Sequence, residues 1–75
     1  MAINSESEIA LASVHRIIKK YGAERVSDSA ADELRRILEV LGENIAKQAV
    51  QLASHAHRKT IKSEDINLAS KNFIK

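Results

Sequence analysis

One apolar stripe runs without a break through the middle of the chain. Its members recur at steps of four, three, four, four, three and four residues, which places their side chains on one face of an α-helix. They are Leu34, Leu38, Leu41, Ile45, Ala49, Leu52 and Ala56. The pattern predicts one helix from about Asp28 to Ala56, roughly 43 Å long at about 1.5 Å per residue. Because a compact globule of 75 residues is only about 30 Å across, the chain cannot cover this stripe alone.

The length of this helix favours an obligate dimer, in which a second copy covers the stripe. We expect the stripe from Leu34 to Leu52 to form the dimer core. A ridge of small side chains beside it would let a partner helix approach closely, although the alanine filler of a generic amphipathic helix explains the ridge equally well. The ridge consists of Gly42, Ala46, Ala49 and Ala53.

A shorter helix is predicted before the long one. It is expected to begin near Ser5 or Ser7, where Ser5 and Glu8 fit a capping box, and to end at Gly22 in a left-handed conformation. Apolar residues spaced by one, three and four would line its inner face. These are Ala10, Leu11, Val14, Ile17, Ile18 and Tyr21.

A second short helix is predicted after the long one. Ser27 is expected to cap the long helix and Ser63 the helix that follows, whose inner face would consist of Ile66, Ala69 and Phe73. The chain has no proline and only two glycines, so little turn chemistry is present. We therefore expect a single all-α domain over residues 1–75, with residues 1–5 flexible.

The composition argues against several kinds of function. No cysteine is present, which excludes disulfides and thiolate metal sites. His55 and His57 are two residues apart and point to different sides of a helix, so no zinc site or other cofactor is expected. No nucleophile lies in a catalytic context, which argues against an enzyme. No stretch is apolar enough to cross a bilayer and no export signal is evident, so we expect a soluble intracellular protein.

Positive charge is concentrated at the two ends of the long helix, although the net charge is only +2. Two chains that cross in antiparallel fashion would bring the first loop of one beside the second loop of the other. A cationic corner would then form at each end, from residues more than thirty positions apart in sequence, and such corners attract phosphate. Its residues are Arg16, Lys19 and Arg25 from one chain and Arg58, Lys59 and Lys62 from the other.

Around these loops the sequence resembles the archaeal histones, which have the minimal histone fold without tails. The resemblance covers nearly all of residues 8–75 and is strongest in residues 16–19, 22–28 and 55–65. It implies a histone fold and a handshake dimer of the protein with itself, or with a paralogous histone. Such a dimer would wrap double-stranded DNA with little sequence preference. It also implies that dimers add along the DNA into nucleosome-like or extended complexes, at the chromosome in the cytoplasm.

The resemblance also implies roles for individual residues. Arg25 matches the arginine that enters the minor groove, with Thr60 of the second copy as its hydrogen-bonding neighbour. The other matched DNA contacts are Arg16, Lys19, Lys59 and Lys62, and Thr60 is itself matched to a phosphate contact. Without the resemblance, each of these would be an ordinary solvated surface residue.

Two further sets of residues match structural positions of the family. Arg58 and Asp65 match a pair that bridges the second loop, and we expect this pair to be partly exposed. A contact surface between dimers is implied at Leu52, His55, Asp65 and Leu68. A histidine–carboxylate contact there would strengthen in mildly acidic solution.

Some residues depart from the family pattern. The usual prolines before the first helix are missing, which predicts an earlier start of that helix. His57 stands where glycine is common, which predicts an altered second loop or obstructed stacking of successive turns.

The alternative function is a histone-fold module that pairs with a different chain in a transcription or chromosome complex without wrapping DNA. An enzyme is the most distant alternative.

Overall fold

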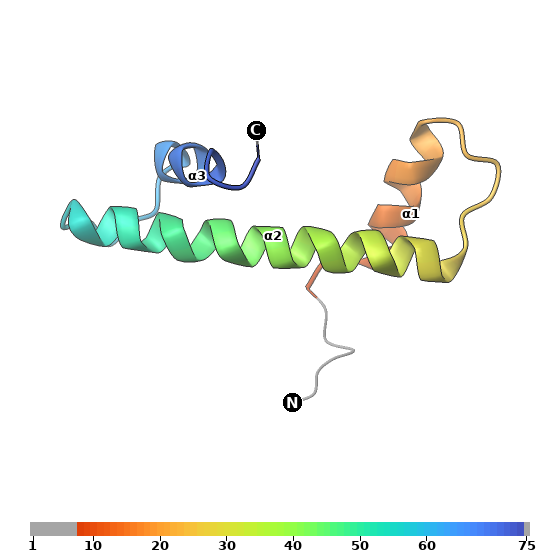
Figure 1. The fold of residues 1–75 in the computed structure, drawn as a ribbon, viewed down its shortest axis with the longest axis horizontal. Coiled ribbons are helices and arrows are strands. Elements are labelled where there is room, and N and C mark those ends of the chain that lie inside the picture. Colours follow the sequence, from red (N-terminus) through yellow and green to blue (C-terminus); the bar gives the residue numbers. More distant parts are fainter. Residues whose placement is uncertain (1–7, 75) are drawn as a thin grey trace, which may run out of the picture. The chain divides into compact units, whose positions relative to one another are not determined.

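The computed structural model describes residues 8–74, which form three α-helices and, within that range, no strand (Figure 1). Helix α1 spans Leu11–Lys20, α2 spans Asp28–His55 and α3 spans Ser63–Ser70. The predicted all-α class and the order of short, long and short helices are confirmed. Within the same range, none of these helices combines the length and the apolar character that crossing a membrane requires.

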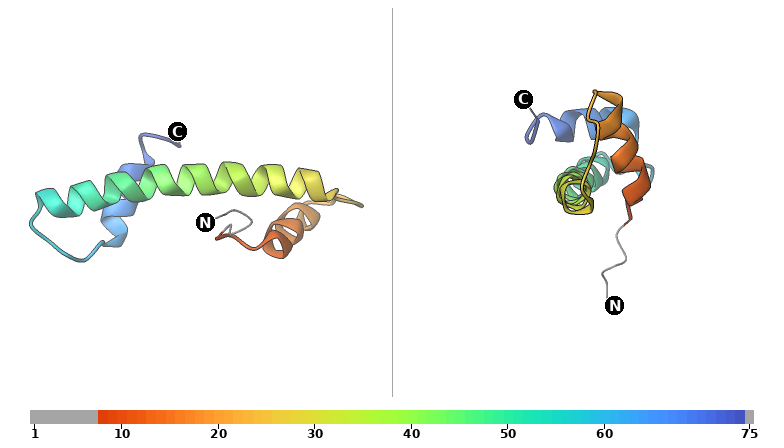
Figure 2. Two further views of the ribbon diagram at one scale, coloured as in Figure 1. Left: turned by 90° about the horizontal axis from the view of Figure 1, so that it is seen from below. Right: turned by 90° about the vertical axis from the view of Figure 1, so that its right-hand side faces the viewer.

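The chain forms two compact units, Met1–Glu39 and Val40–Lys75. The first part of α2 belongs with α1, and its last part belongs with α3; Figure 2 shows α2 from two further sides. The helix has 28 residues and ends one residue before the predicted Ala56.

The start of α1 differs from the prediction. Residues 8–10 are not helical, and the helix begins at Leu11 after the extended Ala10. The earlier start inferred from the missing prolines is therefore wrong, whereas Ser5 and Ser7 themselves lie outside the described residues. The physical reason is a tertiary contact: Glu39 Oε2 accepts the N–H groups of Glu8 at 2.7 Å and Ile9 at 2.9 Å. These amides are satisfied without a helical turn.

The predicted boundary signals between α1 and α2 are confirmed. Gly22 has φ of +106° immediately after α1, the left-handed conformation that glycine adopts without penalty. Ser27 Oγ accepts the N–H of Ala30 at 3.0 Å, so this serine caps α2.

The start of α3 is capped differently from the prediction. Ser63 is the first helical residue, and Lys62 occupies the cap position without a capping side chain of its own. Instead the carboxylate of Asp65 reaches back and accepts the N–H of Lys62 at 2.8 Å. The expectation that Ser63 caps this helix is therefore wrong, because the carboxylate in the first turn satisfies the free amide.

The turn after α2 is a Schellman motif built around His57. The N–H of Arg58 donates to the carbonyl of Ala53 and the N–H of His57 donates to the carbonyl of Ser54, both at 2.9 Å. His57 has φ of +61°, the left-handed region that glycine favours. The backbone therefore takes the conformation expected of glycine even though a histidine is present.

The chain buries only small apolar side chains among its described residues. The buried apolar residues are Val14, Ala31, Ala49, Ala53 and Ala69. The five larger members of the stripe from Leu34 to Leu52 are half-buried. Ile66 of α3 is exposed, as is Phe73, which lies beyond the end of this helix, and only Ala69 of the predicted inner face is buried. Tyr21, which was expected on the inner face of α1, is exposed. The leucines of α2 are thus only partly covered by their own chain.

Replacing His57 by glycine is expected to raise the free energy of unfolding by about 1 kcal/mol per chain, because a side chain in the left-handed region costs roughly that much. Urea unfolding at a fixed protein concentration measures this difference. The matched control is Lys47→Gly at an exposed position inside α2, where glycine should lower stability by about 0.5–1 kcal/mol. Equal effects of the two substitutions on stability would contradict the conclusion that the left-handed conformation at His57 is costly for a histidine.

Candidate nucleic-acid interface

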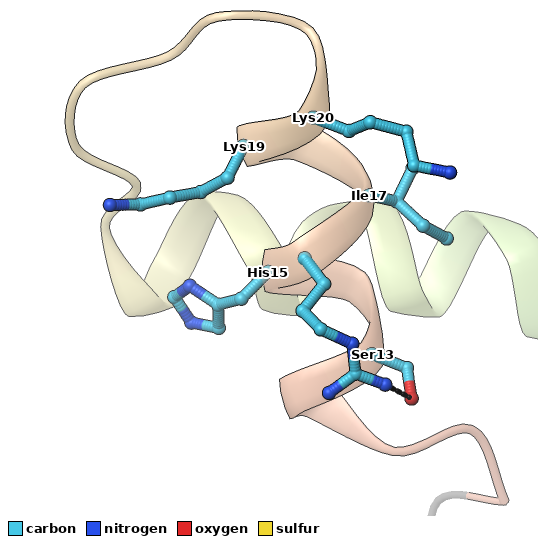
Figure 3. A pocket seen from close by; sticks show the side chains of 6 residues that line it. Ser13, His15, Ile17, Lys19 and Lys20 are labelled. Carbon is cyan, nitrogen blue, oxygen red and sulfur yellow. Dashed lines mark hydrogen bonds between the residues drawn. The ribbon is translucent and has the colours of Figure 1, made fainter.

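The cationic residues of α1 lie around a shallow hollow of about 530 Å³ (Figure 3). Its cationic lining residues are Arg16, Lys19 and Lys20, with His15 beside them. Arg16 donates to Ser13 Oγ at 3.1 Å, and Lys19 Nζ donates to the carbonyl of Glu24 at 3.1 Å. Figure 3 shows Lys19 extending towards the connection that enters α2 and Lys20 extending from the other side of the helix. The hollow includes the predicted DNA contacts Arg16 and Lys19.

The connection between α1 and α2 carries Arg25. Its side chain is exposed, and no hydrogen bond or ion pair holds it among residues 8–74. The contact of Lys19 with the carbonyl of Glu24 brings this part of the connection close to the end of α1. Across the same unit, His15 Nε2 lies 3.3 Å from Asp28 Oδ1 and links α1 to the first residue of α2. The arginine is thus presented to solvent from an anchored connection.

The connection between α2 and α3 is organised by Arg58. Its NH2 group donates to Asp65 Oδ1 at 2.8 Å, and its NH1 group donates to Asp65 Oδ2 at 2.9 Å. NH1 also donates to the carbonyl of Thr60 at 3.0 Å. One guanidinium therefore ties the middle of the connection to the first turn of α3, and it leaves the side chains of Lys59, Thr60 and Lys62 exposed.

The Arg58–Asp65 pair is less exposed than the sequence suggested. The side chain of Asp65 is 6% exposed and that of Arg58 is 28% exposed. The bidentate hydrogen bond from Arg58 and the bond from the N–H of Lys62 lower the pKa of Asp65 from 3.8 to about 2. The carboxylate raises the pKa of Arg58 in return. Planar two-point contacts of this kind fix geometry as well as charge.

A similar network lies at the end of the first unit. Arg35 donates to Glu39 Oε1 at 3.0 Å and pairs with Asp32, and Glu39 also holds the amides of Glu8 and Ile9. The bonds from Ile9 and Glu8, with the charge of Arg35, lower the pKa of Glu39. The only signal in the sequence is the spacing of Asp32, Arg35 and Glu39 by three and four residues, which does not reveal the contact with residues thirty positions away.

Three of the four residues predicted at the contact between dimers line one hollow of about 380 Å³ beside α2 and α3. They are Leu52, His55 and Leu68, joined by polar residues such as Gln48, to which Asn72 donates a hydrogen bond. Asp65 is not part of this lining, since both of its oxygens are engaged by Arg58 and Lys62. A contact between His55 and an Asp65 carboxylate of a second chain stays a prediction.

The two groups of predicted DNA contacts belong to different units. Arg16, Lys19 and Arg25 lie in the first unit, and Lys59, Thr60 and Lys62 lie in the second. Their juxtaposition across two copies of the chain therefore stays a prediction. Over the described part of the chain, no three histidine, aspartate or glutamate side chains gather in a group that could hold a metal ion.

Comparison with known proteins identifies relatives over most of the chain. The family model described as "Histone-like transcription factor (CBF/NF-Y) and archaeal histone" matches residues 7–69. One of the chains of the archaeal histone HAN1 of Thermococcus zilligii is 46% identical over 65 residues, which cover 87% of this chain and 97% of that protein. The probable archaeal histone 3 of Methanocaldococcus jannaschii is 44% identical over 63 residues, or 84% and 94% of the two chains. The major histone H4 of Tetrahymena pyriformis is 33% identical over 58 residues, 77% of this chain and 56% of that histone.

The Asp65 carboxylate is expected to make stability depend on pH in the acid range. Its pKa is lower in the folded chain than the ordinary 3.8, so the unfolded chain binds the proton more tightly. The stabilisation that the ionised Asp65 carboxylate provides is therefore complete above about pH 4 and is lost as the pH falls towards 2. We expect Asp65→Asn to be less stable at pH 7 by several degrees in unfolding midpoint, and to lose less further stability than the wild type between pH 5 and pH 2.

Thermal unfolding across that pH range measures this difference, and an NMR titration of the carboxyl carbon gives its midpoint directly. Glu64→Gln is the matched control, because this exposed carboxylate lies in the same turn. A midpoint near 4 for Asp65 would contradict the role given to Arg58.

Proposed function

Since the chain belongs to the family of histone-like transcription factors (CBF/NF-Y) and archaeal histones, and is thus a DNA-binding chromatin protein with the histone fold, we propose that two copies form a handshake dimer that bends and wraps double-stranded DNA. On this proposal residues 1–75 are one histone-fold domain that is complete only in the dimer. It acts at the chromosome in the cytoplasm, without catalysis.

The main support for a dimer is the apolar surface of α2. Among the described residues the core contains one valine and four alanines, while the five large side chains of the stripe from Leu34 to Leu52 are only half-buried. A row of incompletely buried leucine and isoleucine side chains along one helix face is suited to a protein interface. A second copy of α2 brings the matching apolar stripe, from Leu34 to Leu52, as its complement. An isologous contact of this kind closes into a dimer and leaves no stripe uncovered.

Gly42 offers a point of close approach for the partner helix. Apart from the adjacent residues and the backbone of its own helix, a methyl group added at its Cα would meet no atom within 4 Å, so nothing in the described part of the chain requires glycine there. Glycine inside a helix costs about 1 kcal/mol relative to alanine. We therefore assign this glycine to the crossing of the two α2 helices, where a side chain would hold the backbones apart.

The exposed cations provide the DNA-binding surface of the dimer. In antiparallel crossing, Arg25 of one copy would lie beside Lys59 and Thr60 of the other. Arg25 enters the minor groove, and the remaining residues contact phosphates, which orients the duplex without reading its bases. Bending a duplex over tens of base pairs costs about 1–6 kcal/mol, and several phosphate contacts offset that cost. Arg16, Lys19 and Lys62 extend the same surface.

Further dimers are proposed to add along the DNA through the hollow lined by Leu52, His55 and Leu68. The alternative is a histone-fold module that pairs with a different chain and does not wrap DNA. The inclusion of transcription factors in the family description keeps this alternative in view. The observation that supports packaging is the set of exposed cations at both connections, because a duplex wrapped around the dimer would contact both sets through its phosphates.

Replacing Gly42 by alanine is expected to weaken the dimer, although alanine favours the helix itself. We expect the dissociation constant to rise about tenfold, a loss of about 1.4 kcal/mol. Sedimentation equilibrium over a dilution series gives this constant. Glu43→Ala is the matched control, since Glu43 is the exposed next residue of the same helix. A tighter dimer with Gly42→Ala would place the crossing elsewhere, and a folded monomer of the wild type would refute the dimer.

Replacing Arg25 by alanine is expected to weaken binding to duplexes of unrelated sequence by the same factor, about tenfold. It should also reduce by about one the slope of log affinity against log salt, because one counterion fewer is released. Fluorescence anisotropy with two labelled duplexes across a salt series gives both quantities. Arg36→Ala is the control of equal charge: this exposed arginine of α2 pairs with Glu33 and should leave the slope unchanged.

The same complexes separate packaging from the alternative. Micrococcal nuclease should leave protected fragments that lengthen in regular steps as protein is added. If the wild type binds no duplex under any of these salt conditions, the proposal that the protein packages DNA is refuted, and the alternative of a histone-fold module that pairs with a different chain is favoured. If Arg25→Ala changes which sequence is preferred, the proposed readout through the backbone is wrong.

A further inference from the structure

Tyr21 is the most exposed large apolar side chain in the described part of the chain, at 85%. Its backbone is nevertheless held in place at the end of α1. The N–H of Tyr21 donates to the carbonyl of Ile18 at 3.1 Å, and the N–H of Gly22 donates to the carbonyl of Lys19 at 3.0 Å. The aromatic ring is therefore presented to solvent from an ordered turn.

The surroundings of Tyr21 carry positive charge. Lys19 and Lys20 form the last turn of α1, and the contact of Lys19 with the carbonyl of Glu24 at 3.1 Å draws the segment that bears Arg25 towards this end of the helix. Glu24 is the one carboxylate in the connection. The two lysines also oppose the negative end of the α1 dipole, which would otherwise repel an anion.

We infer that Tyr21, with Lys20 beside it, contacts the sugar–phosphate backbone of duplex DNA next to the contact proposed for Arg25. This inference rests on the proposed function, because it adds a contact to the same DNA surface. The phenol O–H donates a hydrogen bond to a phosphate oxygen, the ring packs on the deoxyribose, and the Lys20 ammonium neutralises a phosphate. Neither residue matches a DNA contact implied by the resemblance to archaeal histones.

Charge complementarity favours DNA over a second protein chain as the occupant. The connection and the last turn of α1 carry the three cations Lys19, Lys20 and Arg25 against Glu24, and Asp28 at the start of α2 is the next carboxylate along the chain, so an excess of positive charge remains. A second copy would bring the same excess of cations to this place. A tyrosine suits a polyanion better, because its ring covers apolar sugar while its hydroxyl stays hydrogen-bonded.

Tyr21 is the only tyrosine of the chain, which makes nitration by tetranitromethane a direct test. Mass spectrometry follows the single product in the free protein and in the protein saturated with a short duplex at low salt. We expect rapid nitration of the free protein and strong protection in the complex. Nitration at the same rate in a complex whose formation is verified by anisotropy would overturn the inference and leave the proposed function intact. Slow nitration of the free protein would also overturn it, since another protein surface would then cover Tyr21.

Affinity measurements separate the contribution of Tyr21 to duplex binding from that of Lys20. Tyr21→Ala should weaken duplex binding about tenfold, the loss of a hydrogen bond to a charged group, with an unchanged salt slope because tyrosine is neutral. The affinity of Tyr21→Phe should lie between those of the wild type and Tyr21→Ala. Lys20→Ala should reduce the salt slope by about one, whereas Lys47→Ala, at an exposed lysine of α2, should not. Wild-type affinity in both Tyr21→Ala and Lys20→Ala would refute the contact. Absence of duplex binding by the wild type would instead refute the proposed function.

Discussion

The structure depends on one constraint: α2 carries an apolar face along 28 residues, and the rest of the chain is too short to cover it. The helices α1 and α3 have ten and eight residues, and the side chains that they help to bury are valine and alanine. The leucines of α2 stay half-buried as a result. In the proposed dimer, stability and assembly are therefore one property, since a second chain would complete the apolar burial that a domain needs. The same crossing would bring the two sets of cations together on one DNA-binding surface.

Arg58 and Asp65 connect the local structure to that surface. Asp65 satisfies the free amide at the start of α3 and both donors of the Arg58 guanidinium, and Arg58 reaches on to the carbonyl of Thr60. The exposed residues of the connection owe their backbone path to this pair. His57, which adopts the left-handed backbone conformation after the end of α2, directs the backbone into the same connection. A residue outside the proposed DNA contacts can thus determine how the residues proposed to contact DNA are presented.

The sequence predicts those parts of the structure that depend on neighbouring residues. The periodicity from Leu34 to Leu52, the cap at Ser27 and the left-handed Gly22 each involve residues a few positions apart, and all three appear as predicted. The start of α1 was missed because it is decided by Glu39, about thirty residues away. The cap of α3 was missed for a different reason: the sequence offers both Ser63 as a cap and Asp65 as an acceptor for the N–H of Lys62, and the structure uses the second. Family resemblance supplies the roles of the DNA-binding residues, which periodicity and composition do not.

The hold of Glu39 on the chain ahead of α1 has an evolutionary consequence. Both of its bonds there are made to main-chain N–H groups, so the carboxylate is indifferent to which side chains stand at positions 8 and 9. These two bonds therefore place no requirement on the side chains at those positions, although Ile9 is itself half-buried. Proline is the exception, because it has no N–H to offer. We therefore expect substitutions of Glu39 to disturb the backbone of residues 8 and 9 more than substitutions at those two positions do.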